Sequence, residues 1–143
     1  MIALDTNLLV YAHLLHTPEH HLAQQAIERA VALNRCGIAY PSLCEFWSVV
    51  TTVRPGKTAS SLQQAKSFIE LLIQDGPLKI WYPTIGFHQR LMEAAQRFEV
   101  HGVKIFDLQI ALLVLENKAT EIWSHDRNFM VLPGLRVHDP LGA

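Results

Sequence analysis

Short apolar segments alternate along the chain with longer segments that have the period of an amphipathic helix. This alternation constrains the fold more than any other feature. Strands are expected at 2–4, 37–40, 78–82, 121–124 and 135–138. Helices between successive strands favour a parallel sheet with right-handed crossovers and with helices on both faces. We therefore predict an α/β fold, a three-layer α/β/α domain with a central, mostly parallel sheet of four to five strands.

The expected helices have apolar stripes and recognisable ends. They are predicted over 8–14, 18–33, 42–53, 58–74, 84–99 and 105–116. Thr17, before Pro18, and Ser42 are interpreted as N-caps, because their side chains can accept a hydrogen bond from the first helical turn. With 143 residues, the chain is expected to form one domain over 1–143.

The composition excludes several classes of protein. Half of the residues are apolar and 17% are charged, which is typical of a globular chain and not of a disordered one. The formal net charge of −1 comes without a run of Lys or Arg that would indicate a nucleic-acid tail. No apolar run approaches the roughly 20 residues of a membrane span, and no secretory signal opens the chain, so a cytoplasmic protein without membrane contact is expected.

Acidic residues stand where such a sheet would place its functional groups. Outside the carboxyl ends of the strands, or at the starts of the helices that follow, are Asp5, Glu45, Asp107 and Asp126. Three of them also have a structural interpretation of comparable weight. Asp5 can be an N-cap, Glu45 can close a capping box with Ser42, and Asp126 can stabilise a turn.

Asp107 is the most informative of these acids. It shares a helical face with Ile110, Ala111 and Val114 in a nearly all-apolar helix, so its carboxylate is expected on a buried stripe. A buried, unpaired carboxylate costs several kcal/mol unless a cation or hydrogen bonds relieve it. The alternative, a cap of that helix, is less favoured because a cap would precede the apolar run.

Several carboxylates at one sheet edge repel each other unless a divalent cation neutralises them. All-oxygen ligands suit Mg²⁺ or Mn²⁺, which assist phosphoester hydrolysis by activating a bound water. A rival metal site at His13, His16, His20 and His21 is disfavoured, because Pro18 interrupts the helical register and no further ligand completes the set.

The acidic segments together resemble the signature of PIN-domain ribonucleases. Their order, their placement relative to the strands and the chain length make the resemblance specific, and it spans nearly the whole chain. The matching segments are Leu4-Asp5-Thr6-Asn7, the helix around Glu45, Phe106-Asp107-Leu108-Gln109-Ile110-Ala111 and Ser124-His125-Asp126-Arg127-Asn128-Phe129. The ending Pro133-Gly134-Leu135-Arg136-Val137-His138-Asp139-Pro140-Leu141 is similar to VapC-type toxins of bacterial toxin–antitoxin pairs.

This resemblance implies an Mg²⁺- or Mn²⁺-dependent endoribonuclease. Asp5 and Asp107 match the principal metal-binding aspartates, and Glu45 and Asp126 match the other two acids, which would reach the metal directly or through water. The supporting polar positions are Thr6, Asn7 and Ser124; many relatives have Thr where this chain has Ser124, and the hydroxyl is kept.

The resemblance also implies partners. It predicts a homodimer, an RNA substrate and a VapB-like antitoxin, with operator DNA contacted only through the antitoxin complex. A basic antitoxin side chain is expected among the acids, and an apolar groove is expected from Leu8, Leu9, Tyr11 and Ala12 and from the helix after Thr58. Candidate phosphate contacts are Arg54, Lys57, Lys104 and Arg127, although each can also be an ordinary solvated charge.

Three other functions remain open at this point. A phosphoacceptor domain would need an acidic pair after the first strand and a Lys after the last. An α/β phosphatase with an aspartyl nucleophile would need a second acid where Asn7 stands. A catalytically silent PIN-like binding module fits the same residues, and only an activity assay separates it from the nuclease.

Overall fold

The sheet and its strand order determine where a site can form. The computed structural model describes residues 1–33, 35–74, 78–130 and 132–142. In this part of the chain, five parallel strands pair in the order β3-β2-β1-β4-β5. They are β1 (Ile2–Leu4), β2 (Cys36–Ala39), β3 (Lys79–Trp81), β4 (Glu121–Trp123) and β5 (Arg136–His138). Strands β2 and β3 lie on one side of β1, and β4 and β5 lie on its other side. In parallel sheets, this change of side leaves a crevice outside the carboxyl ends of the two neighbouring strands, here β1 and β4.

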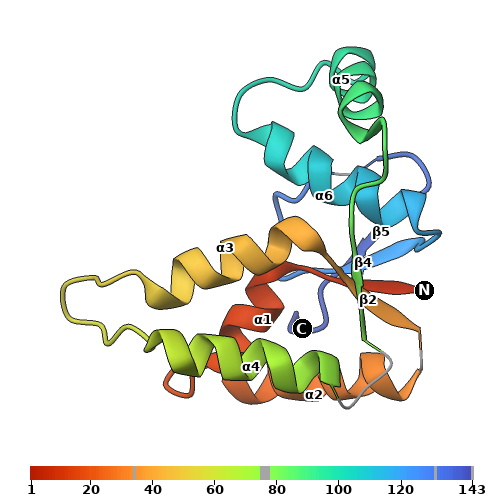
Figure 1. Cartoon of the computed structure of the whole chain (residues 1–143). Coiled ribbons are helices and arrows are strands. Elements are labelled where there is room, and N and C mark those ends of the chain that lie inside the picture. The colour runs from red at the N-terminus through yellow and green to blue at the C-terminus, as the bar shows by residue number, and fades with distance from the viewer. Residues whose placement is uncertain (34, 75–77, 131, 143) are drawn as a thin grey trace.

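Helices cover both faces of the sheet, so the predicted three-layer α/β/α fold is confirmed (Figure 1). On one face are α1 (Thr6–His13), α2 (His20–Ala32), α3 (Tyr40–Thr51) and α4 (Leu62–Gln74); on the other are α5 (Phe87–Arg97) and α6 (Lys104–Glu116). None of the helices in the described ranges combines the length and the apolar character that a bilayer crossing requires.

The strands alternate their side chains between two apolar cores. Leu4 and Ile38 point into the core under α1 to α4, whereas their neighbours Ala3 and Ala39 point into the core under α5 and α6. Helix α6 supplies much of the second core, with Leu108, Ile110, Ala111, Leu113 and Val114 buried. Burial on both faces explains why the central strand β1 is apolar throughout, whereas the edge strands β3 and β5 carry exposed polar residues.

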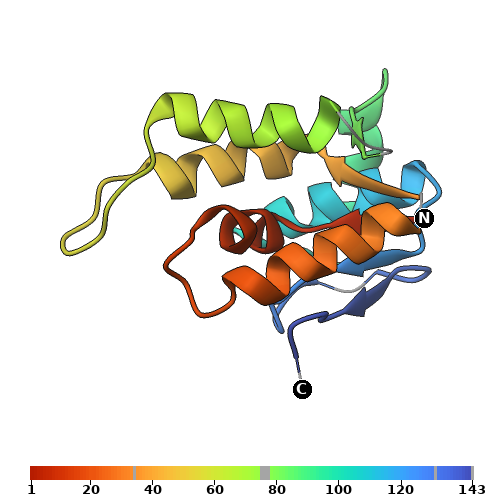
Figure 2. The same cartoon turned by 90° about the horizontal axis from the view of Figure 1, so that it is seen from below.

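Helices α3 and α4 run side by side and project beyond the sheet (Figures 1 and 2). We call the loop that joins them, residues 52–61, the arm. Its tip is a tight turn in which Arg54 and Lys57 form an antiparallel bridge, and its return is held by a hydrogen bond from the Ser60 N–H to the Val50 carbonyl at 2.8 Å. The His13 ring, wedged against Phe46, hydrogen-bonds the Ser60 hydroxyl at 2.7 Å. These contacts fix the arm to α1.

Two predicted caps are wrong. Helix α2 begins at His20, and the Thr17 hydroxyl donates backwards to the Leu14 carbonyl at 2.9 Å instead of capping it. Helix α3 begins at Tyr40, so Ser42 lies inside the helix and is fully buried. In both cases a polar residue beside a proline fits the N-cap pattern, but the helix begins at a different residue and has no side-chain cap.

Gly37 provides a test of the sheet packing. A Cβ at this position would lie 2.8 Å from Cη2 of the Trp81 indole, which packs across the neighbouring strand. We therefore expect Gly37→Ala to lower the free energy of unfolding by about 1–3 kcal/mol in urea denaturation. The double variant Gly37→Ala/Trp81→Leu should lose less than the sum of the two single variants. Strict additivity would contradict this account of the strand β2–β3 contact.

Candidate functional site

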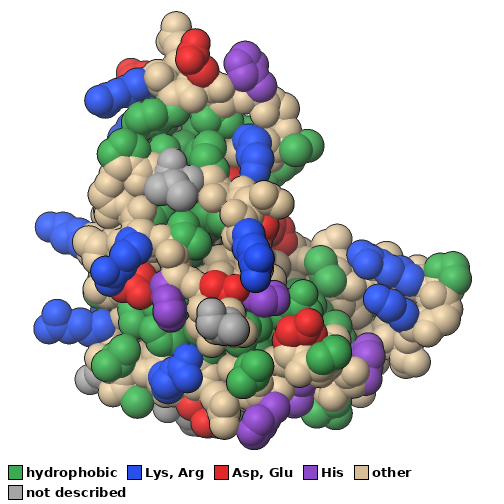
Figure 3. Space-filling view, turned by 180° about the vertical axis from the view of Figure 1, so that it is seen from behind, with side chains coloured by type: hydrophobic (Ala, Val, Ile, Leu, Met, Phe, Trp, Pro, Cys, Tyr) green, Lys and Arg blue, Asp and Glu red, His purple; other side chains and the backbone are tan. Residues whose placement is uncertain are grey.

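The predicted acids meet in one cleft. Asp5, Glu45, Asp107 and Asp126 all line a cavity of about 430 Å³ that opens outside the carboxyl ends of β1 and β4. Apolar side chains from α1 and α3 line it too, namely Val10, Tyr11, Leu14, Val49 and Val50, and the arm adds Thr52, Arg54, Lys57 and Thr58. Figure 3 shows acidic side chains where the projecting helices meet the body of the molecule, and basic side chains on the projection.

Asp5 is the most deeply buried of the four acids. It directly follows β1 and is the N-cap of α1, where its Oδ1 accepts the Thr6 N–H at 2.8 Å. Its Oδ2 accepts the Ser124 hydroxyl at 2.7 Å and the Asn7 side-chain amide at 3.4 Å. The capping interpretation is therefore correct, and Oδ2 in addition binds groups from β4 and α1. Only 6% of the residue is exposed.

The pKa of Asp5 is raised to about 6, mainly by burial and in addition by the nearby charges of Glu45 and Asp107, against the lowering effect of the Ser124 and Thr6 hydrogen bonds. Asp5 is therefore close enough to Glu45 and Asp107 for electrostatic repulsion between the carboxylates. The raised pKa means that the protein alone only partly stabilises the Asp5 charge. A bound cation would stabilise it further.

Glu45 does not close a capping box. Because α3 begins at Tyr40, the carboxylate of Glu45 lies more than one turn into the helix, where its Oε2 accepts the Thr6 hydroxyl at 2.9 Å. Burial raises the pKa of Glu45, and the charge of Asp107 acts in the same direction. Thr6 thus connects two acids, since its backbone N–H binds Asp5 and its hydroxyl binds Glu45.

Asp107 lies in the first turn of α6, whose N-cap is Val103, so it does not cap the helix. The predicted stripe is buried at Ile110, Ala111 and Val114, but the Asp107 side chain at its start is 26% exposed because it faces the cleft. Its Oδ2 accepts the Met130 N–H at 3.4 Å and lies 3.6 Å from Lys104 Nζ. Lys104 also donates to the Asn128 carbonyl at 2.7 Å.

Asp126 stabilises a turn, as its structural interpretation predicts. Its Oδ1 accepts the Asn128 N–H at 2.8 Å, which forms a turn after β4. The residue is exposed at the rim of the cleft, and Arg127 beside it is exposed as well. Asp126 is therefore compatible with a turn residue and with an outer ligand at the same time.

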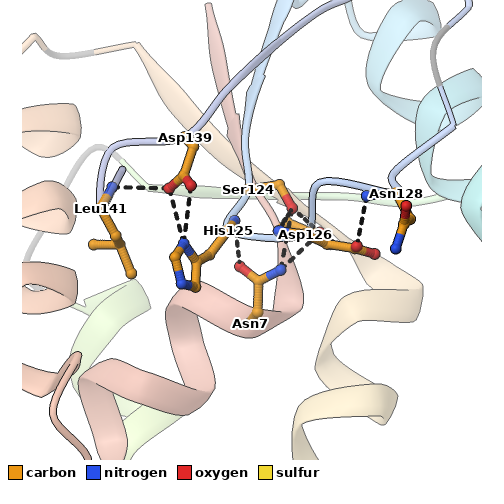
Figure 4. A network of polar contacts seen from close by, with 8 residues as sticks. Asn7, Ser124, His125, Asp126, Asn128, Asp139 and Leu141 are labelled. Atoms are coloured by element: carbon orange, nitrogen blue, oxygen red, sulfur yellow. Dashed lines mark hydrogen bonds and ion pairs between the residues drawn. The ribbon is translucent and has the colours of Figure 1, made fainter. Parts of the chain in front are cut away.

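Asn7 and Ser124 form the centre of a polar network that supports Asp5 (Figure 4). The Asn7 amide donates to Ser124 Oγ at 3.1 Å, and its carbonyl oxygen accepts the His125 N–H at 3.0 Å. The Ser124 oxygen also accepts the Asp126 N–H at 3.1 Å. The network therefore orders the loop after β4 around the buried acid.

Sequence reasoning missed two residues of this network. The ring Nδ1 of His125 contacts both carboxylate oxygens of Asp139 at 3.0 Å, beyond β5. No short motif signals this pair, because its members are 14 residues apart in the chain and meet only when β4 and β5 pair. The arm lining, with Arg54 and Lys57, was identified only as a set of candidate phosphate contacts.

The carboxylates of the cleft suit a magnesium or manganese ion that is bound by one or two of them and by water molecules. Within the described ranges, no three Asp, Glu, His or Cys side chains are arranged to enclose an ion by themselves. Mg²⁺ is commonly held by one or two carboxylates and keeps waters in its other positions. Carboxylates that share one cleft, with raised pKa values at Asp5 and Glu45, match that mode of binding.

The raised pKa of Asp5 gives a testable pH dependence. In the metal-free protein the folded state binds the Asp5 proton more tightly than the unfolded chain, whose pKa is near 3.8, so stability falls as the pH rises from about 4 through about 6. The loss is about 3 kcal/mol at neutral pH. Urea denaturation with chelator should show this slope in wild type and much less of it in Asp5→Asn. Glu70→Gln, on the exposed face of α4, is the matched control and should keep the wild-type slope; equal slopes in wild type and Asp5→Asn would contradict the prediction.

Comparisons with known proteins agree with this geometry. Residues 2–135 match the model of the PIN domain family. The chain is 30% identical over 142 residues to VapC ribonuclease Mb2897 of Mycobacterium bovis and to ribonuclease VapC43 of Mycobacterium tuberculosis, covering 99% of this chain and 96% of each relative.

Solved structures share the fold at lower identity. VapC20 of Mycobacterium tuberculosis, described as a sarcin-ricin loop cleaving toxin, superposes with a TM-score of 0.67 at 14% identity and covers 90% of this chain and 92% of its own. VapBC2 of Rickettsia felis, bound to a promoter DNA fragment, gives a TM-score of 0.65 at 20% identity, with 96% and 98% covered. The chain therefore belongs to the PIN-domain family and, within it, to the VapC ribonucleases.

Proposed function

We propose that this protein is a metal-dependent endoribonuclease that hydrolyses RNA phosphodiester bonds and acts as the toxin of a toxin–antitoxin pair. The observation that carries the proposal is the meeting of Asp5, Glu45 and Asp107 in one cleft from three separate parts of the chain, where burial and, to a smaller extent, the charges of Glu45 and Asp107 raise the pKa of Asp5. A structural role does not require such an arrangement, because mutual repulsion costs stability.

Asp5 and Asp107 would hold Mg²⁺ or Mn²⁺, and Glu45 and Asp126 would reach it directly or through water. The bound ion would supply an activated water and offset negative charge on the phosphate. Thr6, Asn7 and Ser124 orient the acids by the hydrogen bonds described above. Cations near the cleft, Lys104, Arg127, Arg54 and Lys57, are candidates for contacts to RNA phosphates.

The relatives named VapC ribonucleases support an RNA substrate, and the VapBC2 complex with promoter DNA supports a cognate VapB-like antitoxin through which operator DNA is bound. A homodimer belongs to the same proposal. The antitoxin would occupy the acidic cleft, where a basic side chain would compete with the metal.

The apolar surface for the antitoxin differs from the one that the sequence predicts. Leu8, Leu9 and Ala12 are buried in the core beneath α1 and do not reach the cleft. Tyr11 does line it, together with the apolar residues of α1 and α3 named above. An antitoxin helix with one apolar face fits such a surface.

Metal dependence is the first test of this proposal. Purified protein should cleave RNA with Mg²⁺ or Mn²⁺, and a chelator should abolish the cleavage. Asp107→Asn should lower kcat on the order of 100-fold or more, because a metal-activated water lowers the barrier by several kcal/mol. Its melting temperature without metal should not fall, because a repulsive charge is removed. Equal Mn²⁺ affinity of wild type and Asp5→Asn/Asp107→Asn in calorimetry would contradict the ligand assignment.

Expression in cells tests the toxin role. The protein expressed alone should arrest growth, and Asp5→Ala should relieve the arrest because it removes a metal ligand. Coexpression with the neighbouring small open reading frame should also relieve it and yield a complex that copurifies. Mapping of RNA cleavage sites after induction, with Asp107→Asn as the inactive control, would identify the target. A harmless wild-type protein, shown to be folded, would favour a silent binding module instead.

A further inference from the structure

Two polar side-chain contacts join β4 and its following loop to β5 and the segment after it. At the start of the two strands, Arg136 donates to the Glu121 carboxylate at 2.6 Å. Beyond their ends, His125 contacts the Asp139 carboxylate at 3.0 Å. Both pairs hold the edge strand β5 against β4, but only the second one lies beside the acidic cleft (Figure 4).

Asp139 is itself held in place. Its Oδ1 accepts the Leu141 N–H at 2.9 Å, so the turn after β5 fixes the carboxylate. Burial raises the pKa of Asp139, but the hydrogen bonds from His125 and from the Leu141 backbone outweigh it and leave the pKa below its usual value. Asp139 is therefore an ionised, oriented acceptor for the His125 ring.

The His125 backbone transmits this orientation to the site. Its N–H donates to the carbonyl oxygen of Asn7, which forces the Asn7 NH₂ group toward Ser124 and Asp5. Without that donor the Asn7 side chain could turn over and present its carbonyl oxygen to the Asp5 carboxylate, which is repulsive. The Tyr11 and His125 rings also pack in a T-shaped arrangement, with centroids 5.9 Å apart.

We propose that Asp139 is a positioning residue for the acidic cleft: through His125 it fixes the Asn7 amide and the loop 124–128, and thereby the geometry of Asp5. This inference rests on the proposed nuclease function for the test that measures RNA cleavage, but not for the test that measures hydrogen exchange. Asp139 itself does not line the cleft. It acts in the manner of the outer hydrogen-bond partners of metal ligands, whose loss typically lowers metal affinity or activity about 10- to 100-fold.

The test compares Asp139→Ala and Asp139→Asn with Arg136→Gln. Arg136→Gln removes the salt bridge to Glu121, the other side-chain contact between the same two segments, so it is matched for the loss of β5 docking. Asp139→Ala should lower kcat for Mn²⁺-dependent RNA cleavage about 10- to 100-fold with little change in KM. Asp139→Asn keeps one acceptor oxygen, so its kcat should lie between those of Asp139→Ala and wild type. The kcat of Arg136→Gln should stay within about twofold of wild type.

Hydrogen exchange gives a readout that does not depend on activity. The His125 and Asp126 amides, whose hydrogen bonds belong to this network, should exchange faster in Asp139→Ala and unchanged in Arg136→Gln. Unchanged exchange in Asp139→Ala, or an equal loss of activity in Arg136→Gln, would overturn the positioning role. Faster exchange in Asp139→Ala together with a wild type that cleaves no RNA would leave the positioning role standing and refute the nuclease function.

Discussion

The buried carboxylate of Asp5 is the constraint on which the rest of the site depends. It stands at the end of the central strand β1, where burial and the neighbouring acids oppose its charge. Hydrogen bonds from Thr6, Ser124 and Asn7 stabilise the Asp5 carboxylate against these effects. Each of these donors comes from the start of α1 or the end of β4, so the pairing of β1 with β4 and the entry into α1 must both be correct before Asp5 is tolerated.

The topology of the sheet brings the other acids to the same place. Strands β1 and β4 are neighbours at the point where the chain reverses its direction of winding, and the segments after them carry Asp5 and Asp126. Glu45 arrives on α3 after β2, and Asp107 arrives on α6 from the opposite face of the sheet. Acids that are far apart in sequence therefore converge because parallel strands present all their carboxyl ends at one edge.

Much of this arrangement could be predicted from the sequence, because the alternation of strands and helices indicates a parallel sheet and the acids follow strand ends or open helices; the order in which the strands pair could not. The core periodicity placed every helix, although several of its boundaries moved. The caps at Thr17 and Ser42 failed because a polar residue near a proline satisfies the same pattern whether or not its side chain reaches a helix N–H. The pair of His125 and Asp139 could not be found, since it depends on the three-dimensional register of β4 and β5.

Lys104 contacts one of the acids but does not neutralise the cleft. Lys104 Nζ lies 3.6 Å from Asp107, and about half of its side chain is exposed, so solvent screens the pair and its contribution to stability is small. Asp5 and Glu45 keep their raised pKa values despite this lysine. Because the hydrogen-bond donors around Asp5 are all neutral, they orient the carboxylate without cancelling its charge. The cleft therefore keeps a negative potential that would attract the divalent cation proposed above, and its uncompensated charge lowers stability, which the two apolar cores must offset.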